Sequence, residues 1–201
     1  MSTRDRILEA AAAEMMQHGY AASSLTSIAQ RMGLTKGALT RQFPTKEDLA
    51  RAVVDDLETV VDSQRDSSLE AYPGSGIRAA VHFLLTIGRR SREDPLVTAA
   101  AVLLTDRTSP TFAAAGMIAV WKGSFATFFE LAKRVGELPE DTAVSDLAEY
   151  TFITTVGEAA FAARAYSPAA RAEPLHFFRF TMTAAGVAEI DAIVDEVSAD
   201  V

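Results

Sequence analysis

Apolar residues recur at every third or fourth position along nearly the whole 201-residue chain, and alternating, strand-like patterns are scarce. This spacing gathers apolar side chains on one face of a helix. Clusters of proline and glycine divide the pattern into segments, because both residues interrupt helices. The sequence therefore predicts an all-α protein.

The breaks and the residues that precede them define the expected helices. Ser24, Thr35 and Thr45 each stand before an apolar-periodic segment and are favourable N-cap residues. Asp48 completes a capping box with Thr45. Tyr72-Pro73-Gly74 lies in an expected loop that extends from residue 67 to residue 76. The expected helices cover about residues 3–18, 25–32, 36–42, 46–66, 77–92, 94–105, 110–135 and 141–165, with the last helices in 169–198.

Composition limits the kind of protein further. The chain has no cysteine, which excludes a disulfide framework, thiolate zinc sites and a cysteine nucleophile. Its longest apolar stretch, residues 99–104, is far below the roughly 20 residues that span a bilayer. Acidic residues come early at the N-terminus, without the apolar core of a secretory signal. We therefore expect a cytoplasmic protein without a metal or cofactor.

Charge is distributed unevenly along the chain, whose net charge is −8. Residues 1–51 contain seven basic and five acidic side chains, whereas the remainder contains 12 basic and 22 acidic ones. Such an asymmetry is typical of a part that faces nucleic acid joined to a part that does not. We expect the acidic remainder to repel phosphates and to orient the N-terminal part toward DNA.

Residues 24–43 have the spacing of a helix-turn-helix motif. Ala29 is small where the second helix approaches the third, Gly33 allows a tight turn, and Leu39 is expected in the core. This triplet also fits a generic helical hairpin, so the spacing leaves both interpretations open. The expected apolar cluster is completed by Ile28, Met32, Leu34 and Phe43.

A longer stretch, residues 4–54, resembles the TetR family of bacterial transcriptional regulators. The matching residues include ILEAAA in the first helix, His18-Gly19-Tyr20 at its end, GLTKGAL from residue 33, Phe43, and TKEDL from residue 45. The resemblance implies a helix-turn-helix DNA-binding domain in residues 1–50 and a ligand-binding and dimerisation domain in residues 51–201. It also implies a homodimeric repressor that a small molecule releases from a palindromic operator.

The third helix is expected to enter the major groove. There Arg41 has the geometry to bind guanine with two hydrogen bonds, and Gln42 to pair with adenine. Gly37 leaves room where the backbone approaches DNA, and Lys46 is expected at a phosphate. The predicted DNA-binding residues are Ser24, Thr26, Thr35, Lys36, Gly37, Ala38, Thr40, Arg41, Gln42 and Lys46.

One position departs from the family pattern. Proteins similar to this one usually have a tyrosine where this chain has Thr40, and that tyrosine often contacts the DNA backbone. The departure opens an alternative function, that of a small-molecule-binding helical protein whose DNA binding is weakened or lost.

Aromatic residues form a stripe in the second half of the chain. Trp121, Phe125 and Phe128 are spaced i, i+4, i+7, which places them on one helix face. The stripe fits either an apolar ligand pocket with a few polar groups or ordinary core packing. The predicted ligand-binding residues are Phe83, Ile87, Leu103, Met117, Trp121, Phe125, Phe128 and Thr155.

The presence of a single tryptophan in a mid-chain helix is also similar to the γ-butyrolactone autoregulator receptors. These receptors are a branch of the TetR family with a tryptophan over the ligand pocket. The KGAL stretch from residue 36 and a basic loop at Arg89-Arg90-Ser91-Arg92 are similar to that branch as well. This resemblance implies a small, mostly apolar lactone as the effector.

Dimerisation is expected through the eighth and ninth helices. Small residues there allow close packing between helices, and neighbouring large residues supply apolar area. The expected contributors are Gly157, Ala159, Ala160, Ala163, Leu175, Phe177, Phe178 and Met182.

An enzyme is the main alternative of another class. His18, His82 and His176 are isolated in the sequence, and the chain has no HExxH, GxSxG, P-loop or GxGxxG motif. Glu149 and Glu158 are nine positions apart on one expected helix, about 13 Å along its axis, which is too far for a catalytic pair. We therefore do not expect an enzyme.

Overall fold

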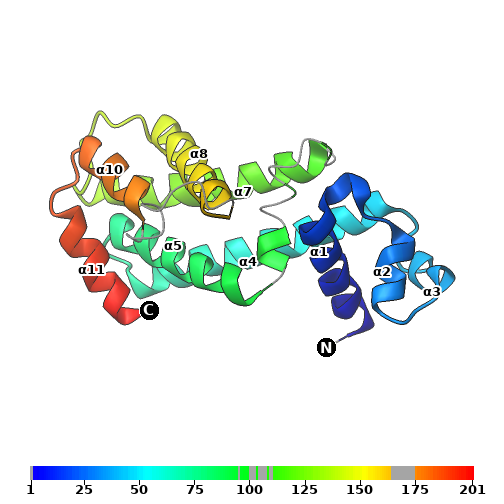
Figure 1. Cartoon of the computed structure of the whole chain (residues 1–201). Helices are drawn as coiled ribbons and strands as arrows, with labels where there is room; N and C mark the ends of the chain where they lie inside the picture. The colour runs from blue at the N-terminus through cyan, green and yellow to red at the C-terminus, as the bar shows by residue number, and fades with distance from the viewer. Residues whose placement is uncertain (1, 95, 100–102, 104–107, 109–110, 164–174) are drawn as a thin grey trace. The chain divides into compact units, whose positions relative to one another are not determined.

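The computed structural model describes residues 2–94, 96–99, 103, 108, 111–163 and 175–201, and none of these residues lies in a β-strand (Figure 1). The all-α prediction is confirmed. The helices with defined bounds are α1 Thr3–Ala22, α2 Leu25–Arg31, α3 Lys36–Thr40, α4 Lys46–Ala71, α5 Gly76–Glu93, α7 Thr111–Arg134, α8 Val144–Ala163, α10 His176–Ala184 and α11 Ile190–Asp200.

The chain forms two compact units. The first contains residues 1–60 and 90–117, and the second contains residues 61–89 and 118–201. The first unit includes the three N-terminal helices, and the second includes α8, α10 and α11. Each unit has its own buried apolar residues.

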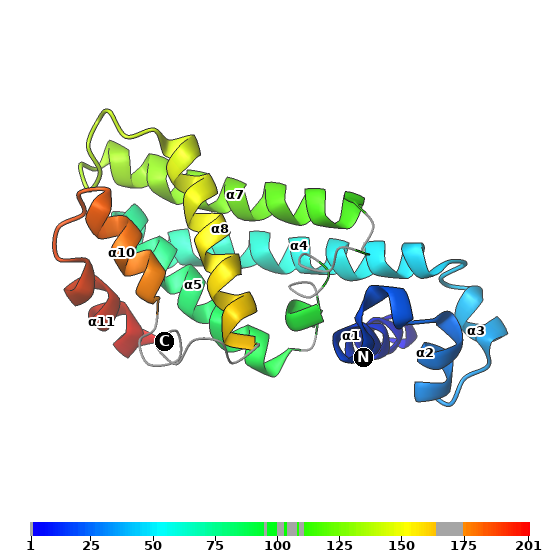
Figure 2. The same cartoon turned by 45° about the horizontal axis from the view of Figure 1, so that its top comes forward.

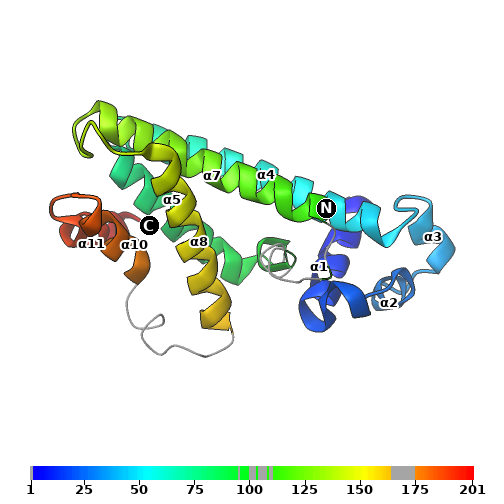
Figure 3. The same ribbon diagram turned by 90° about the horizontal axis from the view of Figure 1, so that it is seen from above.

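In the first unit, α2 lies between α1 and α3 (Figure 3). The apolar face predicted for α1 is buried, with Ile7, Leu8, Ala11 and Met15 at 1% exposure or less. Ser2 begins α1 with a capping box. Gly19 has a φ of 75° and kinks α1 near its end, at the residue where the sequence predicts a stop.

The turn between α2 and α3 forms as the Ala29, Gly33 and Leu39 spacing predicts. Gly33 takes a positive φ of 67°, and the Leu34 N–H donates to the Ala29 carbonyl at 2.9 Å. Ala29 and Leu39 are buried. Leu34 is 36% exposed, so its predicted place in the apolar cluster is wrong: the turn directs this residue outward.

In the second unit, α5 and α7 approach so closely that their backbones touch. A methyl group on Gly76, the first residue of α5, would overlap the Phe128 carbonyl oxygen and the Ala132 nitrogen of α7. The Glu137 carboxylate caps α5, because it accepts from the Ile77 N–H at 3.1 Å and from the Ser75 hydroxyl.

The C-terminal helices of this unit pack in series, with α10 between α8 and α11 (Figure 2). The Arg179 guanidinium on α10 donates to carboxylate oxygens of Asp191 and Asp195 on α11, at 2.8 Å each. From another neighbouring helix, Arg78 of α5 binds Glu196 of α11, with a shortest N–O distance of 2.8 Å. Ion pairs thus join α11 to two neighbouring helices.

Several expected boundaries are wrong. Helix α4 continues to Ala71, five residues beyond the expected end, because no proline or glycine interrupts it before Pro73. The four residues 89–92 lie inside α5 and do not form a loop. Much of the helix expected at 94–105, and the break at Ser167-Pro168, fall outside the described residues.

Candidate nucleic-acid interface and aromatic cluster

Helix α3 has one buried residue and an otherwise solvent-facing surface. Leu39 is fully buried and fixes the inner side of the helix. Thr35 is the N-cap, with its hydroxyl oxygen accepting from the Ala38 N–H at 3.2 Å. The exposed residues around α3 are Thr35, Lys36, Gly37, Ala38, Arg41 and Gln42, all of them predicted from the sequence.

Thr40 differs from these neighbours. It is half-buried, and its hydroxyl donates to the Gly37 carbonyl of the same helix at 3.3 Å. A threonine held this way is short, and its hydroxyl already has an acceptor within its own helix. Arg41 and Gln42 directly follow α3 and carry the long polar side chains of this surface.

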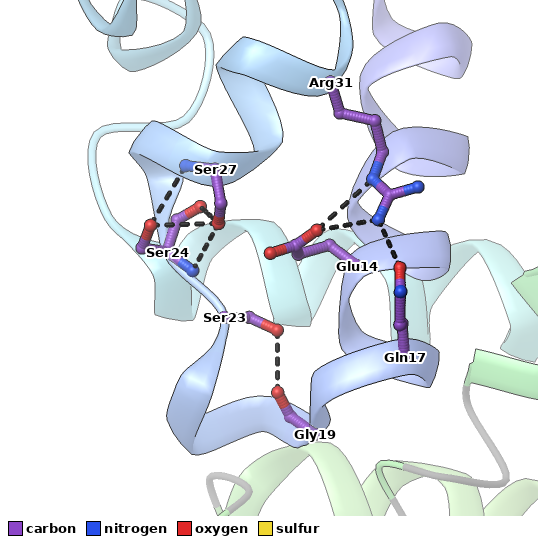
Figure 4. Close-up of polar contacts among 7 residues, drawn as sticks. All are labelled: Glu14, Gln17, Gly19, Ser23, Ser24, Ser27 and Arg31. Atoms are coloured by element: carbon purple, nitrogen blue, oxygen red, sulfur yellow. Dashed lines mark hydrogen bonds and ion pairs between the residues drawn. The ribbon is translucent and has the colours of Figure 1, made fainter.

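The start of α2 is held by a reciprocal pair of serines (Figure 4). The Ser27 N–H donates to the Ser24 hydroxyl oxygen at 3.0 Å, and the Ser24 N–H donates to the Ser27 hydroxyl oxygen at 3.1 Å. Ser24 and Thr26 are exposed at this end, as a phosphate contact requires. Their contacts with DNA stay predictions.

A buried carboxylate fixes α2 against α1 (Figure 4). The side chain of Glu14, on α1, is 7% exposed and accepts from Arg31 Nε at 3.2 Å and from Nη2 at 3.0 Å. Arg31 Nη2 also donates to the Gln17 amide oxygen at 2.7 Å. Hydrogen bonds from Ser27 and Arg31 lower the pKa of the Glu14 carboxyl, so it stays ionised and paired near neutral pH.

Sequence reasoning missed this contact, although a signal was present. Glu14 follows Ile7 and Ala11 at i, i+4, i+7 and so occupies the apolar face of α1. A charged residue in such a stripe needs a partner when it is buried. Arg31, which lies 17 positions later, supplies it.

Lys46 has a structural role that the sequence did not predict. Its ammonium donates to the carbonyl oxygens of Tyr20 at 2.7 Å, Ala21 at 3.3 Å and Ser23 at 3.0 Å, and it lies 4.2 Å from the centroid of the Tyr20 ring. An ammonium has three N–H donors. All three are therefore directed at the end of α1 and none at an outside phosphate.

The predicted aromatic residues meet in the core of the second unit. The ring centroid of Phe83, on α5, lies 5.4 Å from that of Trp121, 6.0 Å from that of Phe125 and 5.4 Å from that of Phe128. All four side chains are buried, as is Ile87. We call these four rings the aromatic cluster.

No described contact links the other predicted ligand-binding residues to the aromatic cluster. Leu103 is buried in the first unit. The side chain of Met117 lies outside the described residues. Thr155 is half-buried on α8. The sequence missed Thr86, whose buried hydroxyl oxygen, like the indole nitrogen of Trp121, has no hydrogen-bond partner among the described residues.

An exposed apolar face covers part of α8 and α10. Tyr150 is 52% exposed, Ile153 57%, Phe177 41% and Phe180 67%. A shallow groove of about 270 Å³ lies in this face. Its lining is Leu147, Tyr150, Phe180, Thr181, Ala184 and Ala185.

The residues expected at a dimer interface are only partly exposed. Phe177 is available, whereas Phe178 and Met182 are buried inside the protomer and supply no interface area, which corrects the expectation for both. Leu175 and Gly157 are half-buried. The side chains of Ala159, Ala160 and Ala163 lie outside the described residues.

No described helix has both the length and the apolar character needed to cross a bilayer. No group of three His, Cys, Asp or Glu side chains within the described part of the chain has a metal-binding arrangement.

The fold and the outward surface of α3 define a class: an all-α protein with an N-terminal helix-turn-helix. Residues 7–53 match the family model described as bacterial regulatory proteins, tetR family. The N-terminal region of the chain is thus similar to the TetR family.

Individual proteins similar to the chain agree with this assignment. The A-factor receptor protein of Streptomyces griseus is 34% identical over 62 residues, which cover 31% of this chain and 22% of that protein. The match therefore spans about a fifth of the length of this curated relative.

Similarity to solved structures extends over nearly the whole chain. A gamma-butyrolactone receptor, an ArpA-like protein, is 22% identical with a TM-score of 0.79, and the match covers 99% of this chain and 98% of the other. CprB of Streptomyces coelicolor, in complex with its operator sequence, is 21% identical with a TM-score of 0.74, covering 98% and 94%. At these identities the likeness establishes the fold.

Proposed function

We propose that the protein is a ligand-responsive, DNA-binding transcriptional regulator that acts as a homodimer in the cytoplasm and is not an enzyme. The observation that carries the proposal is the surface of α3, where Leu39 is buried and the polar residues around it face solvent. A short helix that packs against the protein on one side and is exposed to solvent on the other has the geometry needed to enter a major groove.

Base recognition is assigned to the end of α3. Arg41 binds guanine through two hydrogen bonds, and Gln42 binds adenine in the same manner. Thr35 and Lys36 bind phosphates at the start of the helix, and Gly37 leaves room for the DNA backbone. The structure of CprB with its operator supports DNA binding for a protein of this fold. Lys46, whose donors are directed at carbonyls, is not included.

The homodimer is proposed to form through the exposed apolar face of α8 and α10. Tyr150, Ile153 and Phe180 each expose more than half of their surface. Large exposed apolar side chains gathered on one face are typical of an interaction surface. A homodimer carries two α3 helices, and a dimer that binds two half-sites about 34 Å apart reads a palindrome.

The effector is proposed to bind at the aromatic cluster and to release the protein from DNA. Apolar and aromatic walls with few polar groups are typical of small-molecule sites, and the cluster presents Trp121 and Phe83 in this setting. The relatives described as an A-factor receptor and a gamma-butyrolactone receptor support a lactone as the ligand. The direction of control that we propose is repression.

A second function is favoured by one observation. Thr40 is half-buried and hydrogen-bonded within α3, where similar proteins usually have a tyrosine. A chain that has lost this contact would fit a small-molecule-binding protein with weakened or absent DNA binding. Both functions predict ligand binding, but only the first predicts a preferred DNA sequence.

The deciding experiment is selection of the full-length protein on random duplex DNA, followed by sequencing. The regulator should enrich a single palindrome, and its affinity for that palindrome should fall steeply with salt. Arg41→Ala should lose the enrichment, whereas Arg134→Ala, which removes an exposed charge on α7, should keep it. No enrichment at low salt would reject the regulator and favour the second function.

A further inference from the structure

Hydroxyl groups inside the helices of the second unit commonly bond back to their own helix. The Ser124 hydroxyl donates to the Val120 carbonyl at 2.9 Å, and the Thr181 hydroxyl donates to the Phe177 carbonyl at 2.7 Å. Thr127, Thr151, Thr154 and Thr183 make the same type of bond. Thr86, in the interior of α5, does not, although its hydroxyl oxygen is buried. Its rotamer therefore directs the hydroxyl away from the nearest backbone acceptor.

The register of α5 against α7 places Thr86 near the aromatic cluster. Gly76 meets Phe128 and Ala132 of α7, and Phe83, two turns later, meets Trp121 and Phe125. The two helices thus run antiparallel, and later residues of α5 lie level with earlier residues of α7. Thr86 follows Phe83 at i+3, on the same side of α5, and so lies level with the turn that carries Trp121.

Trp121 has a matching feature. Its indole nitrogen is buried and has no hydrogen-bond partner among the described residues. Buried polar groups in proteins are nearly always hydrogen-bonded, because an unmade bond in apolar surroundings is costly. Trp121 belongs to the aromatic cluster, and Thr86 lies one turn after Phe83 of that cluster. The two unpaired groups, on neighbouring helices, therefore mark a place where an outside molecule would complete the bonding.

We propose that the Thr86 hydroxyl is a ligand-binding group and that it acts together with the Trp121 indole N–H on the carbonyl oxygen of the effector. This inference rests on the proposed ligand site at the aromatic cluster. An indole N–H only donates, so the ligand must present an acceptor. A carbonyl oxygen has two lone pairs and accepts from both groups at once.

The same chemistry limits the class of ligand. Apart from the Thr86 hydroxyl, the groups of this site offer no acceptor and no anion, so an ammonium or a polyol would lose most of its hydrogen bonds to water without replacement. A mostly apolar molecule with a single carbonyl at its polar end, such as a lactone, an ester or a ketone, satisfies both groups. Thr86 and Trp121 would then set a preference for a carbonyl over an ether.

The fluorescence of the protein tests this inference directly, because Trp121 is its only tryptophan. Full-length protein is titrated with γ-decalactone and with the matching cyclic ether, in which a methylene replaces the carbonyl. We expect the wild-type protein to bind the lactone more tightly than the ether. Thr86→Val should weaken lactone binding by about three- to tenfold and leave ether binding nearly unchanged.

Thermal unfolding separates this role from a structural one. Thr86→Val keeps the shape of the side chain and removes an unpartnered hydroxyl, so the Tm without ligand should stay the same or rise. The matched control is Thr59→Val on α4, whose exposed hydroxyl donates to the Asp55 carbonyl. This control should leave lactone affinity unchanged.

Three outcomes overturn the inference. Equal lactone affinity in Thr86→Val and wild type would remove Thr86 from the site, and a clearly lower Tm would show that its hydroxyl supports the fold. No fluorescence or Tm response of the wild-type protein to γ-decalactone would overturn the carbonyl-bearing ligand class. DNA binding is measured separately by selection on random duplexes, so none of these outcomes is confused with failure of the regulator itself.

Discussion

Arg41 combines three properties that single it out among the cationic side chains of the N-terminal region. It is exposed, it directly follows α3, and its guanidinium offers two parallel donors. Arg31 is also an arginine near this motif, but its guanidinium binds Glu14 and Gln17. Position and exposure, rather than charge alone, therefore lead us to propose Arg41 and not Arg31 for base recognition.

Replacing Arg41 by alanine is expected to weaken binding to the selected operator by about 1–3 kcal/mol, the usual value of a bidentate base contact. Arg41→Lys keeps the charge and loses the paired donors, so it should retain the salt dependence and lose discrimination at one base pair. Fluorescence anisotropy at two salt concentrations measures both effects. Unchanged operator affinity in both variants would exclude Arg41 from base recognition.

Glu14→Gln tests the buried contact between α1 and α2. Because the pKa of Glu14 is lowered on folding, its contribution to stability is present above the unfolded pKa of about 4.3 and is lost as the pH falls through the folded pKa. We expect the variant to lose about 1–2 kcal/mol of unfolding free energy at pH 7 and to show a smaller loss of stability on acidification.

Urea unfolding at neutral pH and at about pH 4 measures this difference. The control is Glu9→Gln, which changes an exposed carboxyl on the same helix. If the Glu14 and Glu9 variants are equally stable at both pH values, the contact with Arg31 contributes nothing to stability.

The sequence predicted residues whose role depends on local spacing and missed those whose partners are distant. Ala29, Gly33 and Leu39 lie within eleven positions of one another, so a short motif defines them. Lys46 binds carbonyls 23 to 26 positions earlier, and no local pattern specifies that contact. Thr86 was missed because a sequence does not tell which helical hydroxyls bond back to their own backbone.

At the scale of helices, the expected positions were closer to the structure at the starts than at the ends. N-cap residues such as Ser24 and Thr35 begin α2 and α3 as predicted, because their side chains bind the first free N–H groups. The end of α4 was misjudged, since nothing before Pro73 interrupts the helix. Leu175 and Glu189 precede α10 and α11 in the left-handed conformation, which no sequence rule anticipates for these residue types.

Packing between α5 and α7 yields the prediction that belongs to this scale. Gly76→Ala places a methyl group onto the backbone of Phe128 and Ala132, and backbone atoms cannot move aside without separating the helices. We expect a loss of about 1–3 kcal/mol in unfolding free energy, as for other overpacked sites. Urea unfolding measures the change.

Gly123→Ala is the matched control for this variant. Gly123 lies inside α7 with open space where its Cβ would be, so alanine should raise stability by about 0.5–1 kcal/mol through its higher helix propensity. Equal effects of the two substitutions would show that α5 and α7 do not touch at Gly76.

At the scale of the whole molecule, charge and apolar surface are divided between the two parts of the chain. Residues 1–51 carry the small basic excess, and the acidic excess belongs to the remainder. In the proposed regulator the acidic part would not compete for phosphates, so DNA would be approached by the N-terminal region. The exposed apolar face of α8 and α10 lies in the acidic part and is the surface that we propose for a second copy of the chain.

Phe180→Asp tests whether that face forms the dimer. Phe180 is 67% exposed in the protomer, so its replacement should alter the stability of the monomer by no more than about 0.5 kcal/mol. A carboxylate buried without a partner in an apolar interface is strongly unfavourable. We therefore expect the variant to be a monomer by light scattering coupled to size exclusion, whereas the wild type is a dimer. Val135→Asp, at an exposed apolar residue just after α7 and outside the groove lining, should remain a dimer.

DNA binding extends this test from assembly to function. A dimer contacts both half-sites of a palindrome at once. After one protomer has bound its half-site, the second protomer is held near the other half-site at a high effective concentration. Monomeric Phe180→Asp should therefore lose most of its affinity for the palindrome, while an isolated half-site is bound as weakly by the variant as by the wild type. If the variant stays dimeric and keeps its operator affinity, the dimer forms elsewhere and the groove between Tyr150 and Phe180 has another role.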